Sequence, residues 1–283
     1  LRRLAPDEAV RSSVEVLLRH NKYEDAASEI SENLPPKDFK QAIQDQFKDN
    51  GNPLQGAVTA LPAASSDLVL TTNLDDALER AFAAAGKPFN TVLGGLDLHD
   101  VSGAIQRRKS VLLKIHGSFG DPNWILTLEQ YAAAYGEPKT DLERPLPRLI
   151  RQALLARPLL FLGCSLQTDR TLRVIQESVQ GSSAEHFALL AEKENTGPRL
   201  EQFRQLNIKP LFFRGGHGKI EEFLKCVASA IDVSTSVVSM HIEPTGVDMR
   251  TIAGGQAAFP FWRPETGHRF VGMEERVEQV VTL

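Results

Sequence analysis

Three short segments, far apart in the chain, each end an apolar run with residues that could do chemistry. They are D-L-V-L-T-T-N at 67–73, V-L-L-K-I-H-G at 111–117 and L-L-F-L-G-C-S at 159–165. Each run has the length of a strand, and in a doubly wound parallel sheet ligands bind beyond the carboxyl ends of the strands. If the three strands are parallel neighbours, one edge of the sheet carries Asn73, His116 and the turn formed by Gly163, Cys164 and Ser165. The pattern therefore predicts one site assembled from three distant segments.

The same segments carry a family resemblance. T-T-N-L-D-D at 71–76, K-I-H-G at 114–117 and G-C-S-L at 163–166 resemble, in this order, the three signature segments of sirtuin-like domains. The spacing between Asn73 and His116 is similar as well, and the resemblance covers about residues 1–232. It is strongest to bacterial antiviral defence proteins in which such a domain hydrolyses NAD. The resemblance implies a Rossmann-like fold and NAD as the substrate.

An amide and an imidazole suit the cleavage that this resemblance implies. Nicotinamide leaves NAD as a neutral molecule and needs no proton, while the transition state resembles an oxocarbenium ion. Asn73 can hold a water against the anomeric carbon and fix the ribose, because an amide both donates and accepts hydrogen bonds. His116, with an ordinary pKa of about 6.5, can take a proton from water or a ribose hydroxyl. We expect these two residues to be catalytic.

Five further residues are expected to contact NAD. In the sirtuin family, the aspartate that matches Asp75 helps to shape the nicotinamide pocket. Gly163 allows close backbone approach after its strand, and Cys164 lies in the same turn. Ser165 offers a hydroxyl and a helix-start N–H for a phosphate or ribose, and Thr72 turns its hydroxyl toward the ligand or a neighbouring loop.

Each of these residues also has a purely structural explanation. Asn73 or Asp75 could cap the following helix, and His116 could bond a backbone carbonyl at a strand end. Cys164 could be a small buried apolar residue, with Ser165 in an ordinary capping turn. We favour the functional interpretation of Asn73 and His116 because three strands end this way in the family's order.

Composition and charge limit the classes of function. The chain has 283 residues, 42% of them hydrophobic and 24% charged, with a net charge of −4, so a non-specific nucleic-acid groove is not expected. No apolar run approaches a membrane span, and the opening Leu-Arg-Arg does not resemble a signal peptide. These features are typical of a cytoplasmic protein. We expect NAD⁺ as a partner, and neither nucleic acid nor membrane.

The cysteine content bears on the type of NAD chemistry. Deacetylase sirtuins, as a family, hold a structural zinc with four cysteines at short spacing. This chain has only Cys164 and Cys226, which are far apart, so we expect no metal in this region. The hydrolysing branch is therefore favoured over the deacylase branch, and a disulfide between the two thiols is not expected in a reducing compartment.

Hydrophobic periodicity predicts an α/β fold with a parallel sheet and a smaller N-terminal helical module, and the family resemblance implies that the sheet is doubly wound and Rossmann-like. Residues 1–62 have helical spacing, and from 67 onward strands alternate with helices. The expected strands are 67–72, 89–93, 111–116, 158–163, 186–191 and 208–213, and the expected helices are 75–86, 141–157, 169–180, 197–206 and 218–231. We divide the chain into a helical module at 1–66, a sirtuin-like core at 67–232 and, at 233–283, a linker followed by the start of a further module.

The two ends of the chain bear on the domain organisation that the resemblance implies. Sirtuin-like domains begin with a strand and a glycine-rich, phosphate-binding turn, and nothing of that kind precedes residue 67. At the other end, 233–268 has a linker composition with a possible strand at 237–242. R-F-V-G-M-E-E-R-V-E-Q-V at 269–280 then resembles the opening of STAND-type NTPase modules, with Met273 where arginine is usual. The resemblance implies an effector domain fused to such a module, in which ATP and Mg²⁺ would bind.

The predicted function is that of an NAD⁺ glycohydrolase that yields nicotinamide and ADP-ribose. What the resemblance implies further is depletion of NAD in antiphage defence, gated by homo-oligomerisation when other domains sense a phage-derived trigger. Two alternatives remain open. One is an NAD-dependent protein deacylase, and the other is a non-catalytic scaffold that senses NAD or ADP-ribose.

Overall fold

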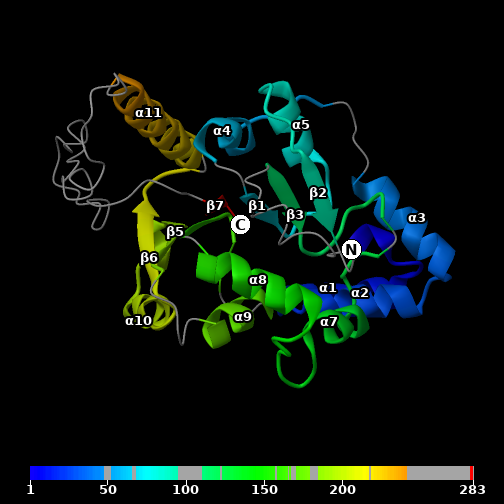
Figure 1. Ribbon diagram of the computed structural model, residues 1–283. Coiled ribbons are helices and arrows are strands. Elements are labelled where there is room, and N and C mark those ends of the chain that lie inside the picture. Colours follow the sequence, from blue (N-terminus) through cyan, green and yellow to red (C-terminus); the bar gives the residue numbers. More distant parts are fainter. Residues whose placement is uncertain are drawn as a thin grey trace.

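The computed structural model describes residues 1–47, 52–65, 68–94, 110–121, 123–156, 158–164, 166, 170–178, 184–216, 218–240 and 281–282. It confirms an α/β fold with a parallel sheet and an N-terminal helical segment, α1–α4 (Figure 1). The chain first forms helices and then alternates strands with helices, as the periodicity predicts.

The helical segment contains α1 (Glu8–Arg19), α2 (Tyr23–Glu32), α3 (Pro36–Phe47) and α4 (Ala57–Ala64), after a short 3₁₀ turn η1 (Arg2–Leu4). Asp7 starts α1 by accepting a hydrogen bond from the Val10 N–H at 2.9 Å. Helices α1–α3 bury an apolar cluster that also takes in Leu74 and Trp124, which follow β1 and β3. The helical segment is thereby joined to the loops of the predicted site.

The strands are β1 (Leu68–Thr71), β2 (Thr91–Gly94), β3 (Val111–Lys114), β4 (Leu159–Leu162), β5 (His186–Ala191), β6 (Ile208–Phe213) and β7 (Val281–Thr282). They form one sheet in the order β2-β3-β1-β7-β4-β5-β6, and all the pairings are parallel. Every residue of β1 and β3 is buried, as expected for strands with both faces covered.

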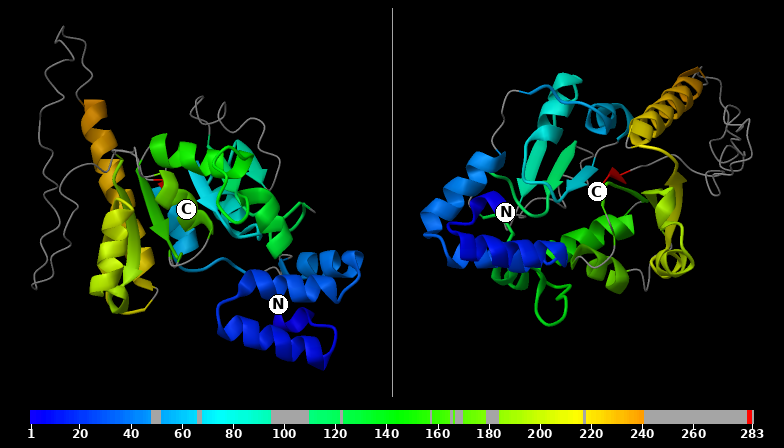
Figure 2. Two further views of the ribbon diagram at one scale, coloured as in Figure 1. Left: turned by 90° about the horizontal axis from the view of Figure 1, so that it is seen from below. Right: turned by 180° about the vertical axis from the view of Figure 1, so that it is seen from behind.

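Helices cover both faces of this sheet (Figures 1 and 2). The largest core cluster joins β1, β3 and β4 to α7 (Leu128–Tyr135), α8 (Pro145–Ala156) and α9 (Arg170–Ser178). On the opposite face, Val69 and Leu112 pack against Phe82 of α5 (Ala77–Ala84). The described residues also form a 3₁₀ turn η2 (Glu192–Glu194), α10 (Gly197–Gln205) and α11 (Gly218–Met240), of which α11 packs on α4.

Three features differ from the expected elements. Strands β1 and β3 are neighbours, but β7 lies between β1 and β4, so the condition that all three strands are neighbours is met only by β1 and β3. Helix α7 was not predicted, because its short alanine-rich run lies among glycines and prolines. The strand expected at 237–242 is wrong as far as residue 240, because α11 continues to Met240 despite valines that favour strands.

Within the described part of the chain, no helix has the length and apolarity needed to cross a membrane.

Candidate functional site

Strands β1 and β3 bring Asn73 and His116 to the same edge of the sheet. Thr71 and Lys114, the last residues of the two strands, are paired in the parallel register. Asn73 and His116 each lie two residues beyond that pair. The strand pairing continues one step further, since the Ile115 N–H donates to the Thr71 carbonyl at 2.9 Å. The register thus places the predicted amide and imidazole at one carboxyl edge.

The loop after β1 leaves the Asn73 side chain exposed. The Asn73 N–H donates to the Thr71 hydroxyl at 3.1 Å, and Thr72 is exposed as well. Helix α5 begins at Ala77 with Asp76 at its N-cap, so Asn73 is not its capping residue. Asp75 does stabilise the helix start, because its carboxylate accepts a hydrogen bond from the Ala77 N–H at 3.1 Å. The structural explanation therefore applies to Asp75 and not to Asn73.

His116 is held between two tyrosines of α7. Its Nδ1 lies 3.2 Å from the Tyr131 hydroxyl, and its Nε2 lies 3.2 Å from the Tyr135 hydroxyl. Both rings meet the imidazole edge-on, with centroids 5.1 Å and 6.3 Å away. A neutral imidazole donates through one nitrogen and accepts through the other, so it can bond both hydroxyls at once.

Burial changes the acid–base character expected of His116. Desolvation of the ring lowers the pKa of His116 to about 4, well below the ordinary value on which the sequence prediction relied. The imidazole is therefore neutral at physiological pH. In this state it is a hydrogen-bonding group whose charged form is unfavourable, rather than a base poised near neutrality.

Lys114, the residue two positions before His116, supports the loop that carries Asn73. Its side chain is 1% exposed, and its ammonium donates to the Asp75 carbonyl and, at 2.8 Å, to a Glu79 carboxylate oxygen. Sequence reasoning missed this role. The available signal was a lysine inside the apolar run V-L-L-K-I, since a buried lysine in a sheet needs an anionic partner.

The loop after β3 needs glycine at position 117. Gly117 has a φ of +91°, and a Cβ there would lie 2.8 Å from the Cα of Trp124. The Phe119 N–H donates to the Leu74 carbonyl at 3.0 Å, which joins this loop to the one after β1. The two loops of the site are thus tied directly to each other.

A family model described as SIR2-like domain matches residues 67–211. The chain belongs to the SIR2-like family. The match begins beside β1 and ends within β6, so it includes Asn73, His116 and all the strands between them in the chain. SIR2-like domains bind NAD, and the match implies an NAD-related activity.

The third predicted segment of the SIR2-like domain lies farther along the same edge. Gly163 follows β4 with a φ of +68°, a conformation that glycine adopts without strain. Cys164 is partly buried and packs against the main core, and neither it nor Cys226 forms a disulfide. Ser165 lies outside the described residues. Because β7 intervenes, this segment is two strands away from β1.

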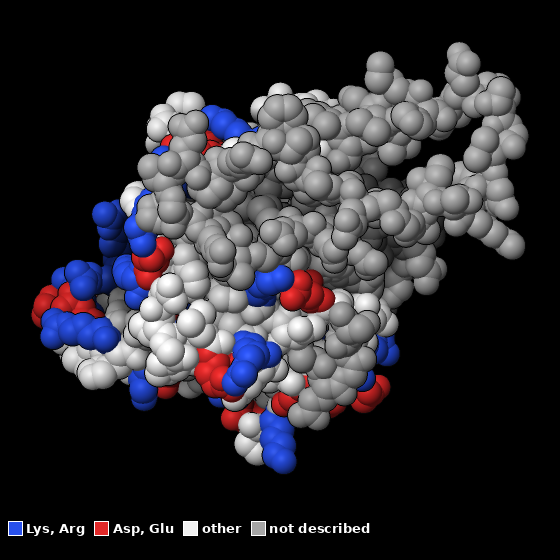
Figure 3. Space-filling model, turned by 90° about the vertical axis from the view of Figure 1, so that its left-hand side faces the viewer, with Lys and Arg blue, Asp and Glu red and all other residues white. Residues whose placement is uncertain are grey.

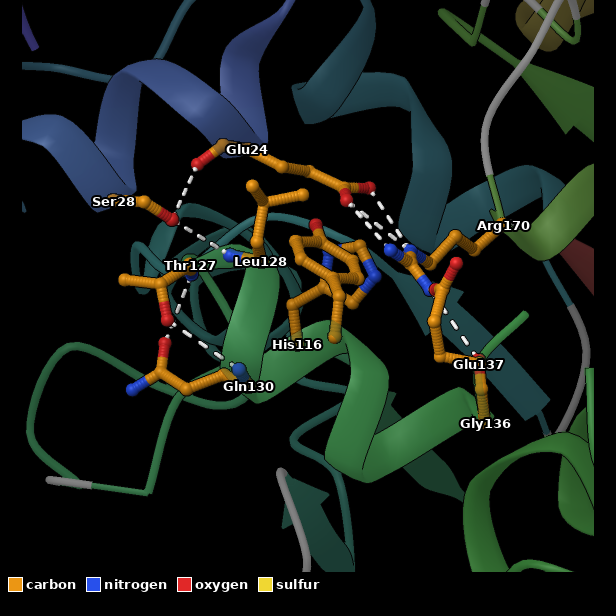
Figure 4. Close-up of polar contacts among 10 residues, drawn as sticks. Glu24, Ser28, His116, Thr127, Leu128, Gln130, Gly136, Glu137 and Arg170 are labelled. Atoms are coloured by element: carbon orange, nitrogen blue, oxygen red, sulfur yellow. Dashed lines mark hydrogen bonds and ion pairs between the residues drawn. The ribbon is translucent and has the colours of Figure 1, made fainter.

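A charged cluster next to the SIR2-like site was not predicted. The Arg170 guanidinium donates to both oxygens of Glu24, at 3.1 Å and 3.3 Å, and to Glu137 at 2.9 Å (Figure 4). It also lies over the Tyr131 ring, 5.5 Å from the centroid. No sequence signal links these residues, because Glu24 is in α2 of the helical segment, outside the family match.

Among the described residues, no group of three histidine, cysteine or acidic side chains could hold a metal ion. On the face shown in Figure 3, lysines and arginines alternate with acidic residues. Arg214, directly after β6, forms an ion pair with Glu192, directly after β5, at 3.1 Å.

Proposed function

We propose that the SIR2-like domain is an NAD⁺ glycohydrolase, which converts NAD⁺ and water into nicotinamide and ADP-ribose. The observation that carries this proposal is the paired end of β1 and β3, beyond which Asn73 and His116 lie in equivalent positions. The family match supports NAD as the ligand. The amide of Asn73 and the neutral imidazole of His116 would have different roles in this reaction.

The role assigned to Asn73 is to orient the attacking water and to bind the ribose. Its side chain is exposed at the sheet edge, where an amide can donate to one oxygen and accept from another. Because nicotinamide leaves as a neutral molecule, no general acid is required. Orientation of the water against the anomeric carbon supplies most of what the chain must provide.

His116 is assigned a hydrogen bond to a ribose hydroxyl or to the attacking water. Full protonation would create a buried cation, which desolvation opposes. The negative charges of a bound NAD pyrophosphate would raise the pKa of His116 and make proton uptake easier. The imidazole would therefore become a better base only after the substrate has bound.

The remaining predicted residues would line the ligand. Thr72 is exposed beside Asn73, and Gly163, Cys164 and Ser165 would approach the phosphates or the second ribose from the loop after β4. Asp75 would act mainly by holding the start of α5, with its carbonyl bonded to Lys114. These assignments are part of the proposal.

The biological role proposed is NAD depletion in antiphage defence. It is supported by the resemblance of 269–280 to the opening of a STAND NTPase module, which lies outside the described residues. Such a module would sense a phage-derived trigger and drive self-association. Because the activity would require this assembly, the monomer would not deplete the NAD of its own cell. Full hydrolysis by a dilute monomer without any trigger would contradict this gating.

The test is nicotinamide release from NAD⁺ by the full-length protein, measured with its trigger, alongside Asn73→Ala and His116→Ala. We expect both variants to lose hydrolysis while far-UV circular dichroism shows an intact fold. Release of nicotinamide that neither substitution reduces would refute the assignment of the two residues. No release by the wild type in any assembled state would refute the hydrolase.

One observation favours a second candidate, a non-catalytic NAD-binding scaffold. Both nitrogens of His116 already have hydroxyl partners, so neither faces a substrate until one bond is exchanged. Calorimetric titration distinguishes the two functions. Tight NAD binding with no turnover would support the scaffold, and turnover would exclude it.

A further inference from the structure

We propose that the helical segment positions His116, with Glu24 and Ser28 of α2 acting as positioning residues that hold both ends of α7. The inference rests on the proposed function, in which His116 contacts the substrate. Glu24 and Ser28 lie outside the SIR2-like match, so the domain would depend on a segment that the family match does not include.

The first end of α7 is fixed by Ser28. The Leu128 N–H, one of the free donors at the helix start, donates to the Ser28 hydroxyl at 2.9 Å. That hydroxyl in turn donates to the Glu24 carbonyl at 3.0 Å. A capping box of Thr127 and Gln130 stabilises the same turn from within α7. Figure 4 shows α2 lying against this end of the helix.

The second end of α7 is fixed by Arg170. Its guanidinium bonds Glu24 through two nitrogens and also contacts the Gly136 carbonyl and the Glu137 carboxylate, directly after α7. The Arg170 side chain is 11% exposed, and bidentate pairing of this kind has a defined geometry. Through Arg170, Glu24 therefore holds the end of α7 that lies opposite Ser28.

Helix α7 transmits this position to the imidazole. Tyr131 and Tyr135 are four residues apart, so they lie on one face of the helix, and their hydroxyls meet the two nitrogens of His116. Arg170 also lies over the Tyr131 ring. A small displacement of α7 would move both hydroxyls together and release the ring from its present orientation.

Loss of the Glu24 charge would weaken this arrangement without removing a core side chain. Arg170 would keep Glu137, which is 54% exposed, and would lose its bidentate partner. The expected consequence is greater freedom of α7 and of His116 at an unchanged fold. A rate that falls while substrate binding stays the same would reflect this loss of orientation.

The experiment compares Glu24→Gln with Glu32→Gln in the full-length protein. Glu32 is an exposed carboxylate at the end of the same helix, so the control removes the same charge. We expect Glu24→Gln to lower kcat about tenfold with little change in KM, and Glu32→Gln to behave as wild type. Ser28→Ala provides an independent variant at the other end of α7, with the same direction of effect.

A second readout does not require activity. In protein labelled with ¹⁵N-histidine, we expect the His116 ring signals at pH 7 to broaden or shift in Glu24→Gln and Ser28→Ala, and not in Glu32→Gln. If both variants keep the wild-type His116 signals and kcat, the inference is overturned and the hydrolase stands. If the signals change but the wild type never hydrolyses NAD⁺, the positioning is supported and the proposed function fails.

Discussion

The two ends of the parallel strands each hold a histidine with a lowered pKa: His116 is half-buried and His186 is fully buried, and their surroundings differ. His116 lies just beyond the carboxyl end of β3, and His186 begins β5 at the amino edge. Burial lowers the pKa of both to about 4. His116 has a tyrosine hydroxyl at each nitrogen, whereas Nδ1 of His186 accepts from the Leu159 N–H at 3.2 Å and its Nε2 has no hydrogen-bond partner among the described residues.

This comparison shows that a lowered pKa of a histidine does not by itself identify a functional site. His186 packs edge-on against Phe161 and is 0% exposed, so its pKa reflects enclosure in the core. His116 reaches a similar value at the carboxyl end of the strand paired with β1, beyond which exposed Asn73 lies, and its partner Tyr131 is in contact with Arg170. The neighbours of each histidine, rather than its pKa, distinguish a candidate site from a core residue.

The largest expected effect tests this difference directly. We expect His116→Ala to lower kcat/KM for NAD⁺ hydrolysis by about 10²–10⁴-fold, since it removes a group positioned for proton transfer. His186→Asn, which keeps an acceptor for the Leu159 N–H, should leave the rate close to wild type. A nicotinamide-release assay measures the rate of both variants. Equal losses would show that the two edges do not differ in function.

The next effect concerns the buried cation that supports the carboxyl edge. Glu79→Leu leaves the Lys114 ammonium buried with only the Asp75 carbonyl, and we expect a loss of about 3 kcal/mol in the free energy of unfolding. Lys114→Met should cost less, about 1 kcal/mol, because Glu79 is 27% exposed and can be hydrated. Urea unfolding at pH 7 measures both. The reverse order would mean that Lys114 is not effectively buried.

Acid should lower the free energy of unfolding through protonation of His186, which begins β5. A folded-state pKa of about 4 for His186, below its unfolded value, means that the unfolded chain binds the proton more readily. The stabilisation is present above pH 6.5 and is lost as the pH falls toward 4, by about 2 kcal/mol between pH 7 and pH 5. Urea unfolding at both values should show a shallower pH dependence in His186→Asn. An unchanged slope would refute this contribution.

The smallest expected effect concerns the loop after β4. Gly163→Ala places a Cβ at a φ of +68° with no atom of the described residues within 4 Å, so backbone strain of about 1 kcal/mol is expected. Gly218→Ala is the matched control, because the backbone of Gly218 does not have a positive φ and its Cβ would also meet no described atom within 4 Å. Thermal unfolding should show a lower Tm for the first variant only. A loss of NAD binding in Gly163→Ala beyond this strain would strengthen the role proposed for Gly163.

The residues that were predictable are those next to strands. Asn73 and His116 could be located because an apolar run of strand length ends at each of them, and parallel strands end at one edge. The strand at 208–213 and the helix starting at 218 were predicted for the same reason, since local periodicity determined them. Helix α7 escaped prediction because its short run lies among glycines and prolines and is supported by a tertiary contact with Ser28, although its capping box of Thr127 and Gln130 was a local signal.

The sequence by itself determined the alternation of strands and helices, the family signatures and the two residues proposed for catalysis, because these depend on local spacing. Only the tertiary structure decided that His116 is enclosed by two tyrosines and has a pKa of about 4. Only the structure joined Glu24 to Arg170 and inserted β7 between β1 and β4. Contacts between residues distant in the chain, and the desolvation that they cause, leave no periodic trace in the order of the amino acids.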